Sequence, residues 1–391
     1  MTEGRLRRWS FDPPAADAGA GTTWAIIAGG GTAGHVLPAI AIAQAMVARG
    51  HRPEAIHFVG SRRGIERRLV PEAGFTVTLL AGRGVARHLT IENLAAIAGL
   101  MLSVGQAVAL VARRRPAVVV SVGGYASAGC VLAAALLRVP IVVAEQNAVP
   151  GAANRWAARV ARASAVSFEG TPLPGAVLTG NPVRSEVLAV ARHPAARARA
   201  RQELGLPADA VVVAAFGGSL GARRINDAVA ALARMWQPRT GVAIRHVIGA
   251  RDWETRPPAP DRPADGAGLV YQQIRYEDRM DLVYAAADLA VCRAGASTVA
   301  ELAAVGLGAI LIPLPGAPGD HQTANAVALV SAGAARLIAD AELTGPLLAE
   351  VLDPLLADKA RLTAMSEAAR RLGRPGAAGA VAQLAEENAR A

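Results

Sequence analysis

The feature that most restricts the fold of this chain is an apolar strand that passes into a glycine-rich turn and then a helix, three times over. The turns are Gly29 to His35 after a strand at 24–28, Gly123 to Ser127 after a strand at 117–122, and Gly217 to Gly221 after a strand at 210–216. Strands that alternate with helices predict parallel sheets covered on both faces. Because such sheets bind ligands where strands pass into helices, the three turns mark a candidate site.

The alternation begins twice along the chain. Strands are expected at 24–28, 55–59, 76–80, 117–122 and 141–144, and again at 210–216, 242–248, 289–292 and 309–314; helices are expected at 38–49, 93–112, 344–356, 360–372 and 377–391. A chain of 391 residues fits two domains of roughly 150 to 200 residues. We therefore predict two Rossmann-like halves joined near residues 180–184. Residues 1–22, polar and unpatterned, are expected to be a disordered extension.

Composition indicates a globular protein, with 52% apolar and 18% charged residues. Cys130 and Cys292 form no disulfide or metal motif, which favours a reducing cytoplasm. Residues 93–112 carry no charge and are long enough to span a membrane. Large apolar residues at positions 94, 97, 101, 104, 108 and 111 instead predict the stripe of a packed helix. One face of this helix could still touch lipid.

The net charge of +10 and the pI near 10.9 predict a polyanionic partner. Nucleic acid, an anionic membrane surface and a pyrophosphate substrate are the candidates. With aromatic residues at only 4% and no nucleic-acid-binding motif, we expect no nucleic-acid partner. The Ala/Arg run at 195–201 is interpreted as a solvated helix face.

Residues 292–325 carry the most specific chemistry. A strand runs into Arg293 to Thr298, a helix follows with Glu301 expected in its first turn, and a later loop ends in Asp320-His321-Gln322. The N–H groups at a helix start suit a pyrophosphate, whereas a carboxylate there suits ribose hydroxyls. The pattern predicts a site for a nucleoside diphosphate sugar. A nicotinamide cofactor is disfavoured, because no acidic residue ends the second strand.

His35 follows the first glycine turn at the expected carboxyl edge of the sheet. Its imidazole could take a proton from an attacking hydroxyl, or it could only satisfy backbone groups at the helix start. Both interpretations stay open at this point. The chain contains no Asp-x-Asp motif, so the sequence requires no metal, and no cofactor is expected.

Several segments together resemble the MurG family of N-acetylglucosaminyltransferases. They are GGGTAGHVLPAIAIA, SVGGYASAGC, EQNAVPGAANRWAA, TGNPVR, FGGSLGARRIN, YAAADLAVCRAGASTVAEL and DHQTANA. The resemblance implies a GT-B fold, in which residues 23–182 with the last helix (373–391) bind the acceptor and residues 183–372 bind UDP-N-acetylglucosamine. It also implies transfer of N-acetylglucosamine, with inversion, to the C4 hydroxyl of lipid I (undecaprenyl-pyrophosphoryl-MurNAc-pentapeptide), giving lipid II for peptidoglycan.

The resemblance carries site residues over one by one. Those implied to bind the donor are Thr32, Ala33, Gly34 and Asn147 beside the sugar, Arg184 and Ser219 at the nucleotide and diphosphate, Ala296, Ser297, Thr298 and Glu301 at the helix start, and Gln322 on the sugar. Ala33 replaces the glycine of many members. Glu277 stands where an aliphatic residue usually flanks uracil, so only a backbone contact is carried over. His35 is the candidate base, with Glu145 and Tyr125 as alternatives or as contacts to the acceptor pyrophosphate.

A lipid-linked acceptor implies peripheral attachment to the cytoplasmic face of an anionic membrane. Arg83, Arg87 and His88 precede the apolar stretch 91–102, and three arginines follow it at 113–115, which fits an interfacial binder. A buried crossover helix with ordinary flanking arginines is the alternative. Association with other cell-wall synthesis proteins is left open.

Two other functions remain to be weighed. One is a different GT-B transferase with a glycolipid or natural-product acceptor. The other is a UDP-N-acetylglucosamine 2-epimerase, which the absence of a cluster of acidic residues and histidines disfavours.

Overall fold

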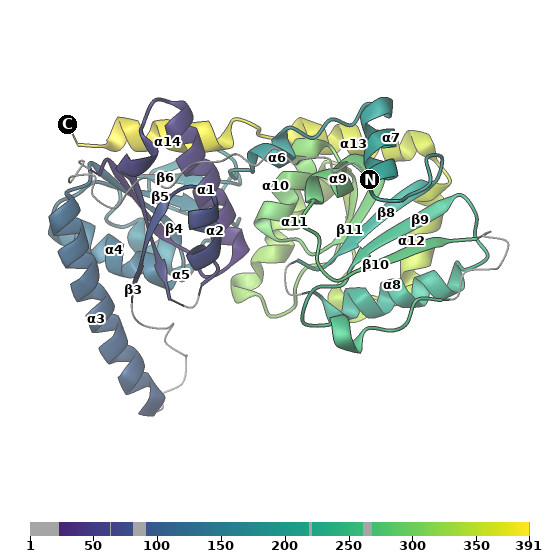
Figure 1. The fold of residues 1–391 in the computed structure, drawn as a ribbon, viewed down its shortest axis with the longest axis horizontal. Helices are drawn as coiled ribbons and strands as arrows, with labels where there is room; N and C mark the ends of the chain where they lie inside the picture. The colour runs from purple at the N-terminus through teal and green to yellow at the C-terminus, as the bar shows by residue number, and fades with distance from the viewer. Residues whose placement is uncertain (1–22, 63, 81–90, 219–220, 261–267, 391) are drawn as a thin grey trace, which may run out of the picture.

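The computed structural model describes residues 23–62, 64–80, 91–218, 221–260 and 268–390, with only the helical backbone given for residues 91–100. These residues form two lobes that lie side by side, each built on a parallel sheet with helices on both faces (Figure 1). The expected extension at 1–22 lies outside the described residues, as do Ser219, Arg83, Arg87 and His88.

Parallel strands make up both sheets. The first contains β1 (Ala25–Gly29), β2 (Ile56–Ser61), β3 (Thr76–Leu80), β4 (Val118–Gly123), β5 (Ile141–Glu145), β6 (Ala163–Val166) and β7 (Ala176–Leu178), and the second contains β8 (Val211–Phe216), β9 (Val242–Val247), β10 (Val270–Ile274), β11 (Leu289–Cys292), β12 (Ala309–Leu311) and β13 (Ala335–Leu337). The spatial orders are β3-β2-β1-β4-β5-β6-β7 and β10-β9-β8-β11-β12-β13. Both are Rossmann orders, which confirms the predicted fold class.

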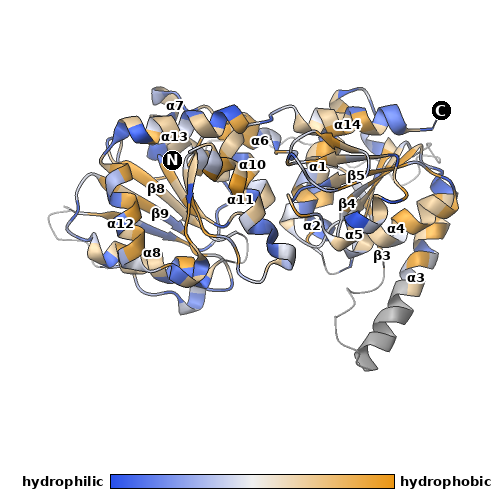
Figure 2. Ribbon diagram, turned by 180° about the vertical axis from the view of Figure 1, so that it is seen from behind, coloured by the Kyte–Doolittle hydropathy of each residue, from blue (hydrophilic) through white to orange (hydrophobic). Residues whose placement is uncertain are grey.

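Helices cover the faces of both sheets (Figure 1). They are α1 (Ala33–Ala48), α2 (Glu66–Glu72), α3 (Ile91–Arg114), α4 (Tyr125–Leu136), α5 (Ala152–Ala157), α6 (Ser185–Leu188), α7 (Pro194–Glu203), α8 (Arg223–Met235), α9 (Met280–Ala286), α10 (Ala296–Val305), α11 (His321–Ser331), α12 (Gly345–Leu356), α13 (Lys359–Leu372) and α14 (Ala377–Asn388). Hydrophobic residues gather on the strands and on the helix faces turned toward them (Figure 2).

The first helix begins earlier than the sequence indicated. Pro38 was expected to open it, since proline favours a first helical position. In the structure α1 starts at Ala33, and Thr32 occupies the N-cap position with an extended backbone. The glycine turn therefore ends at Gly31, and His35 lies in the first turn of the helix.

The predicted packing stripe of α3 is right only in part. Val111 is buried and Val108 packs against the same core, but Met101 of the stripe is 71% exposed, and the side chains at positions 94 and 97 lie outside the described residues. The small residues Ser103 and Ala107, which the stripe did not include, are buried where α3 contacts α4. Small residues let the two helices approach closely at this interface, where Gly129 of α4 lies directly against Ser103 and Ala107. One end of α3 projects from the body of the lobe (Figure 1). Within the described part of the chain, no helix is long and apolar enough to cross a membrane.

The C-terminal helix returns to the first lobe. After α13 on the second lobe, α14 packs on α1, and Val381, Leu384 and Ala385 join the core of the first sheet (Figure 1). Glu386 also pairs with Arg49, the C-cap residue of α1. The chain thus crosses between the lobes twice.

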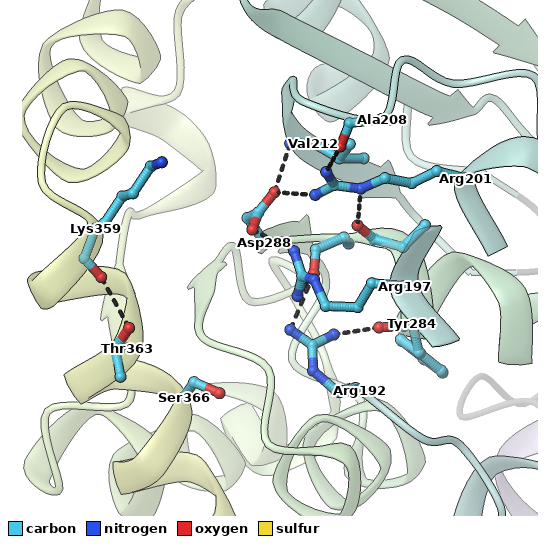
Figure 3. Close-up of polar contacts among 12 residues, drawn as sticks. Arg192, Arg197, Arg201, Ala208, Val212, Tyr284, Asp288, Lys359, Thr363 and Ser366 are labelled. Carbon is cyan, nitrogen blue, oxygen red and sulfur yellow. Dashed lines mark hydrogen bonds and ion pairs between the residues drawn. The ribbon is translucent and has the colours of Figure 1, made fainter. Parts of the chain in front are cut away.

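The Ala/Arg run on α7 is only in part the solvated face that the sequence suggested: Ala195, Ala198 and Arg199 are exposed, and the other residues of the run are buried or half-buried. Arg197 and Arg201 both pair with Asp288, and Arg192 donates to the carbonyls of Tyr284 and Ala287 at the end of α9 (Figure 3). Arg201 is only 8% exposed. The guanidinium groups satisfy carbonyls that a helix end leaves unpaired, so α7 is fixed to the second lobe.

Candidate active site

The order of strands decides where the candidate residues meet. In each sheet the order reverses beside the first strand, between β1 and β4 and between β8 and β11. Ligands of open α/β sheets bind at such switch points, outside the carboxyl ends of the strands. Two of the predicted glycine turns lie at the first switch point. The third lies at the second, beside the Arg293 to Thr298 segment.

His35 lies directly over the second glycine turn. A side chain at Gly123 would begin 3.3 Å from the imidazole Nε2, so the absence of a Cβ there leaves room for the ring. Its Nδ1 lies 3.0 Å from the hydroxyl of Thr32. Burial lowers the pKa of His35 below 6.5, although the carboxylates of Glu145 and Glu66 act in the opposite direction. The imidazole is therefore neutral at neutral pH.

Glu145 ends β5 beneath this histidine and is 3% exposed. Its Oε1 accepts hydrogen bonds from the backbone and side-chain amides of Asn147, and its Oε2 accepts from the Gly151 backbone and from Asn154. Asn154 in turn accepts from Ser121 on β4. Since four N–H donors already occupy the carboxylate, Glu145 orders the loop that carries Asn147. This arrangement favours His35 over Glu145 as the base.

Tyr125 is the first residue of α4, immediately after the second glycine turn. Its hydroxyl is buried and has no hydrogen-bond partner in the structure. Burial raises the pKa of Tyr125, which keeps the phenol protonated. The side chain is therefore suited to donate a hydrogen bond to a ligand rather than to accept a proton.

The second switch point presents hydrogen-bond donors. Helix α10 begins at Ala296, after Gly295 at the N-cap position, and Thr298 lies in its first turn. The hydroxyl of Ser297 is buried without a partner. Glu301 is the sixth residue of α10, so it lies in the second turn and not, as expected, in the first.

Glu301 is paired rather than free. Its Oε1 lies 3.2 Å from a guanidinium nitrogen of Arg184, and its Oε2 accepts a 2.7 Å hydrogen bond from Tyr284. Burial alone would lower the pKa of Arg184, but the Glu301 carboxylate outweighs it and raises the pKa. The Nε of Arg184 is buried without a partner. The structure thus brings together two predicted donor-site residues, one from the segment between the lobes and one from α10.

The two switch points face each other across a contact that the sequence did not indicate. Asn325 of α11, which is fully buried, accepts a hydrogen bond from the Ala148 backbone and donates to the Asn147 side chain. The same amide donates to the Ala294 carbonyl. One side chain therefore joins the loop after β5 to the loop after β11. Gly319 also lies against Val149, and His321 is close enough to His35 to lower its pKa.

The other predicted donor-site residues lie in both lobes. Ala33 and Gly34 lie in the first turn of α1, and Gly34 is exposed. The Gln322 amide oxygen accepts from the Leu314 backbone. The Glu277 carboxylate is turned into an ion pair with Arg245, so its side chain is engaged within the lobe. The resemblance implied only a backbone contact from Glu277, and a side chain engaged in this ion pair is compatible with that contact.

Comparison with known proteins identifies the lineage. Residues 25–166 match the glycosyltransferase family 28 N-terminal domain, and residues 212–384 match the C-terminal domain of that family. The UDP-N-acetylglucosamine--N-acetylmuramyl-(pentapeptide) pyrophosphoryl-undecaprenol N-acetylglucosamine transferase of Acidothermus cellulolyticus is 44% identical over 94% of this chain and 98% of its own length. The chain belongs to the MurG family.

Solved structures agree with this assignment. The crystal structure of MurG from Acinetobacter baumannii is 28% identical, covers 93% of this chain and 99% of its own, and superposes with a TM-score of 0.73. A UDP-GlcNAc 2-epimerase from Neisseria meningitidis, solved with UDP-GlcNAc bound, has a TM-score of 0.61 at 10% identity over 93% of this chain and 99% of its own. At that identity the likeness extends to the fold alone. The closer relationship to MurG therefore favours membership of the MurG family over an epimerase.

Proposed function

We propose that this protein transfers N-acetylglucosamine from UDP-N-acetylglucosamine to the C4 hydroxyl of lipid I, forming lipid II with inversion at the anomeric carbon. The observation that carries the proposal is the opposition of two unlike groups across the Asn325 contact. A neutral histidine lies on one side, and on the other are a helix start and Arg184. A base and an anion site that face each other are what displacement of a nucleotide diphosphate from a sugar requires.

His35 is the proposed general base. When its Nδ1–H donates to the Thr32 hydroxyl, the lone pair of Nε2 is left to accept a proton. The acceptor hydroxyl loses its proton to Nε2 as its oxygen bonds to the anomeric carbon. The bond from that carbon to the β-phosphate oxygen breaks, and UDP departs with the electron pair.

The departing UDP needs its new negative charge stabilised. The N–H groups at the start of α10 and the partial positive charge of the helix end are suited to this task. The buried Ser297 hydroxyl and the Arg184 Nε are donors still free for a ligand. With these groups in place, the chain's own residues can stabilise the pyrophosphate.

The decisive experiment incubates the protein with UDP-N-acetylglucosamine and a short-chain lipid I analogue and determines product masses. We expect the analogue to gain one N-acetylhexosamine and UDP to be released in equal amount. UDP released without glycosylated analogue, or an epimerised sugar nucleotide, would overturn the proposal. A soluble sugar acceptor serves as the control for the alternative that another class of acceptor is used.

Peripheral docking on an anionic membrane is the second part of the proposal. The exposed Met101 and Leu102 on the projecting helix α3 supply apolar surface, and Arg113 and Arg115 are exposed at its other end. A helix that carries both exposed apolar residues and basic residues suits an interface, each charge contributing about 1 kcal/mol near an anionic surface.

Vesicle co-sedimentation tests the docking surface. Binding should require anionic lipid, weaken with salt, and fall when Met101 and Leu102 become serine or when Arg83 and Arg87 become glutamate. Binding that ignores lipid charge and salt would mean that this surface does not dock. Exchange of the exposed Leu136 on α4 for serine is a matched control for loss of an apolar side chain elsewhere.

A further inference from the structure

A buried carboxylate lies beneath the first glycine turn. Glu66, the first residue of α2, is 1% exposed. Its Oε2 accepts a 2.8 Å hydrogen bond from the Gly31 backbone, and its Oε1 accepts from the backbone (2.6 Å) and the hydroxyl (3.0 Å) of Ser61. The two carboxylate oxygens thus tie the turn after β1 to the end of β2.

Three glycines make room for this carboxylate. A Cβ built on Gly30 would lie 2.6 Å from it, one on Gly60 would lie 2.3 Å from its stem, and one on Gly64 would lie 1.9 Å from an oxygen. All three distances are too short for real side chains. The site is therefore shaped around Glu66, and two of these glycines lie outside the turn itself.

A glycine turn after the first strand of a Rossmann-like sheet ordinarily presents its N–H groups to a substrate phosphate. Here a carboxylate of the chain itself accepts the Gly31 N–H. We propose that Glu66 is a positioning residue: it occupies the anion position of the first glycine turn, excludes substrate phosphate from it, and fixes Thr32 and His35 for the acceptor hydroxyl. This inference rests on the proposed function, and it assigns both substrate diphosphates to other parts of the cleft.

The charge of Glu66 also reaches the proposed base. The groups that face His35 are Glu145 from β5, Glu66 from α2 and His321 from α11. Burial lowers the pKa of His35, His321 lowers it too, and the two carboxylates raise it. Glu66 therefore keeps His35 more basic than its burial alone would allow.

The test compares Glu66→Gln, Gly60→Ala and Glu72→Gln with the wild type. Glu66→Gln removes the charge at nearly constant volume. Gly60→Ala keeps Glu66 but displaces its carboxylate by steric contact. Glu72, exposed on the same helix and paired with Arg68, is the matched control. Turnover of the lipid I analogue, its pH profile and the titration of the His35 ring by NMR are measured for each protein.

We expect kcat to fall about a hundredfold in Glu66→Gln, as for a reacting group moved by about 1 Å, with donor KM unchanged. The His35 pKa and the acid limb of kcat/KM should both move to lower pH. Gly60→Ala should lower kcat in the same way, and Glu72→Gln should match the wild type.

Two outcomes would overturn the inference while leaving the proposed function intact. One is that the wild type is active and that both variants, Glu66→Gln and Gly60→Ala, keep the wild-type kcat and the wild-type His35 titration. The other is a Glu66→Gln protein with tighter binding of the acceptor diphosphate but wild-type kcat. If the wild type itself forms no lipid II analogue, the proposed function fails, and the His35 titration still reports whether Glu66 acts on the ring. Should Glu66→Gln not fold, Gly60→Ala carries the test alone.

Discussion

The two switch points have the same architecture and opposite electrostatics. At the first, two buried carboxylates, Glu66 and Glu145, accept the N–H groups of the surrounding turns and lie around His35. At the second, the start of α10, Ser297 and Arg184 present donors, some of which have no partner. A Rossmann-like fold therefore fixes where a ligand binds but not its charge. The proposed function therefore gives base chemistry to one lobe and anion binding to the other, through the residues placed at the strand ends.

Among the substitutions considered, removal of His35 should have the largest effect on activity. We expect His35→Ala to lower kcat by about a hundredfold or more, because a general base is lost. The KM for UDP-N-acetylglucosamine should change little, since the proposed donor site lies at the other switch point. Steady-state kinetics with both substrates varied give the two values. A raised donor KM with normal kcat would move His35 to the donor side.

Removal of Glu301 should affect the opposite lobe. A hydrogen bond to a charged group is worth about 1.5 to 3 kcal/mol, so Glu301→Ala should raise the donor KM by roughly tenfold to hundredfold. Arg184 would also lose its partner. Glu350→Ala, exposed on α12, is the control. A loss of kcat at saturating donor, with the donor KM unchanged, would contradict the assignment.

Asn325 joins the loop after β5 to the loop after β11. The substitution Asn325→Ala should separate the two switch points. The substitution leaves the Ala148 N–H and the Ala294 carbonyl without partners, at a cost of about 1 to 3 kcal/mol. Thermal unfolding measures this cost. We expect a lower Tm together with a higher donor KM, because Asn147 loses its support. A variant with the wild-type Tm and KM would show that the contact couples nothing.

Acid should destabilise both lobes, each through one buried histidine. Burial lowers the pKa of His57 in the first sheet and of His246 in the second to about 3. An unfolded histidine with a pKa of 6.5 takes up a proton that the folded one refuses, so stability is present above pH 6.5 and is lost as the pH falls toward 3. Each histidine should cost roughly 1.4 kcal/mol one pH unit below 6.5. The Tm of His57→Gln should fall less steeply with pH than that of the wild type; equal slopes would contradict the assignment.

The sequence predicted the fold well because most strands are short apolar runs, and three of them run into glycine turns. The edge strand β3 was predicted, but the edge strands β7, β10 and β13 escaped prediction, as did β6 beside β7. β10 reads VYQQI and is partly exposed throughout, so its polar residues conceal it. The start of α1 was misplaced because Pro38 resembles a first helical residue. The stripe of α3 was right at Val108 and Val111 and wrong at Met101, because side-chain size was used as the guide, whereas the small residues Ser103 and Ala107 also pack on α4.

Site residues were predictable where a motif surrounds them and not where distant segments meet. Arg184 and Glu301 were both named from the sequence, but their pairing joins residues 117 positions apart. Glu66 carries no local pattern, since its role depends on glycines in three different segments. Asn325 is part of the DHQTANA motif, yet nothing in that motif indicates a contact with the loop after β5.

Calorimetric titration of UDP into the wild type, His35→Ala and Glu301→Ala tests most directly whether the base and the donor site lie at different switch points. We expect the wild type and His35→Ala to bind UDP with the same affinity and Glu301→Ala to bind it roughly tenfold to hundredfold more weakly. Folded His35→Ala protein that no longer binds UDP, or folded Glu301→Ala protein with undiminished affinity, would contradict this expectation.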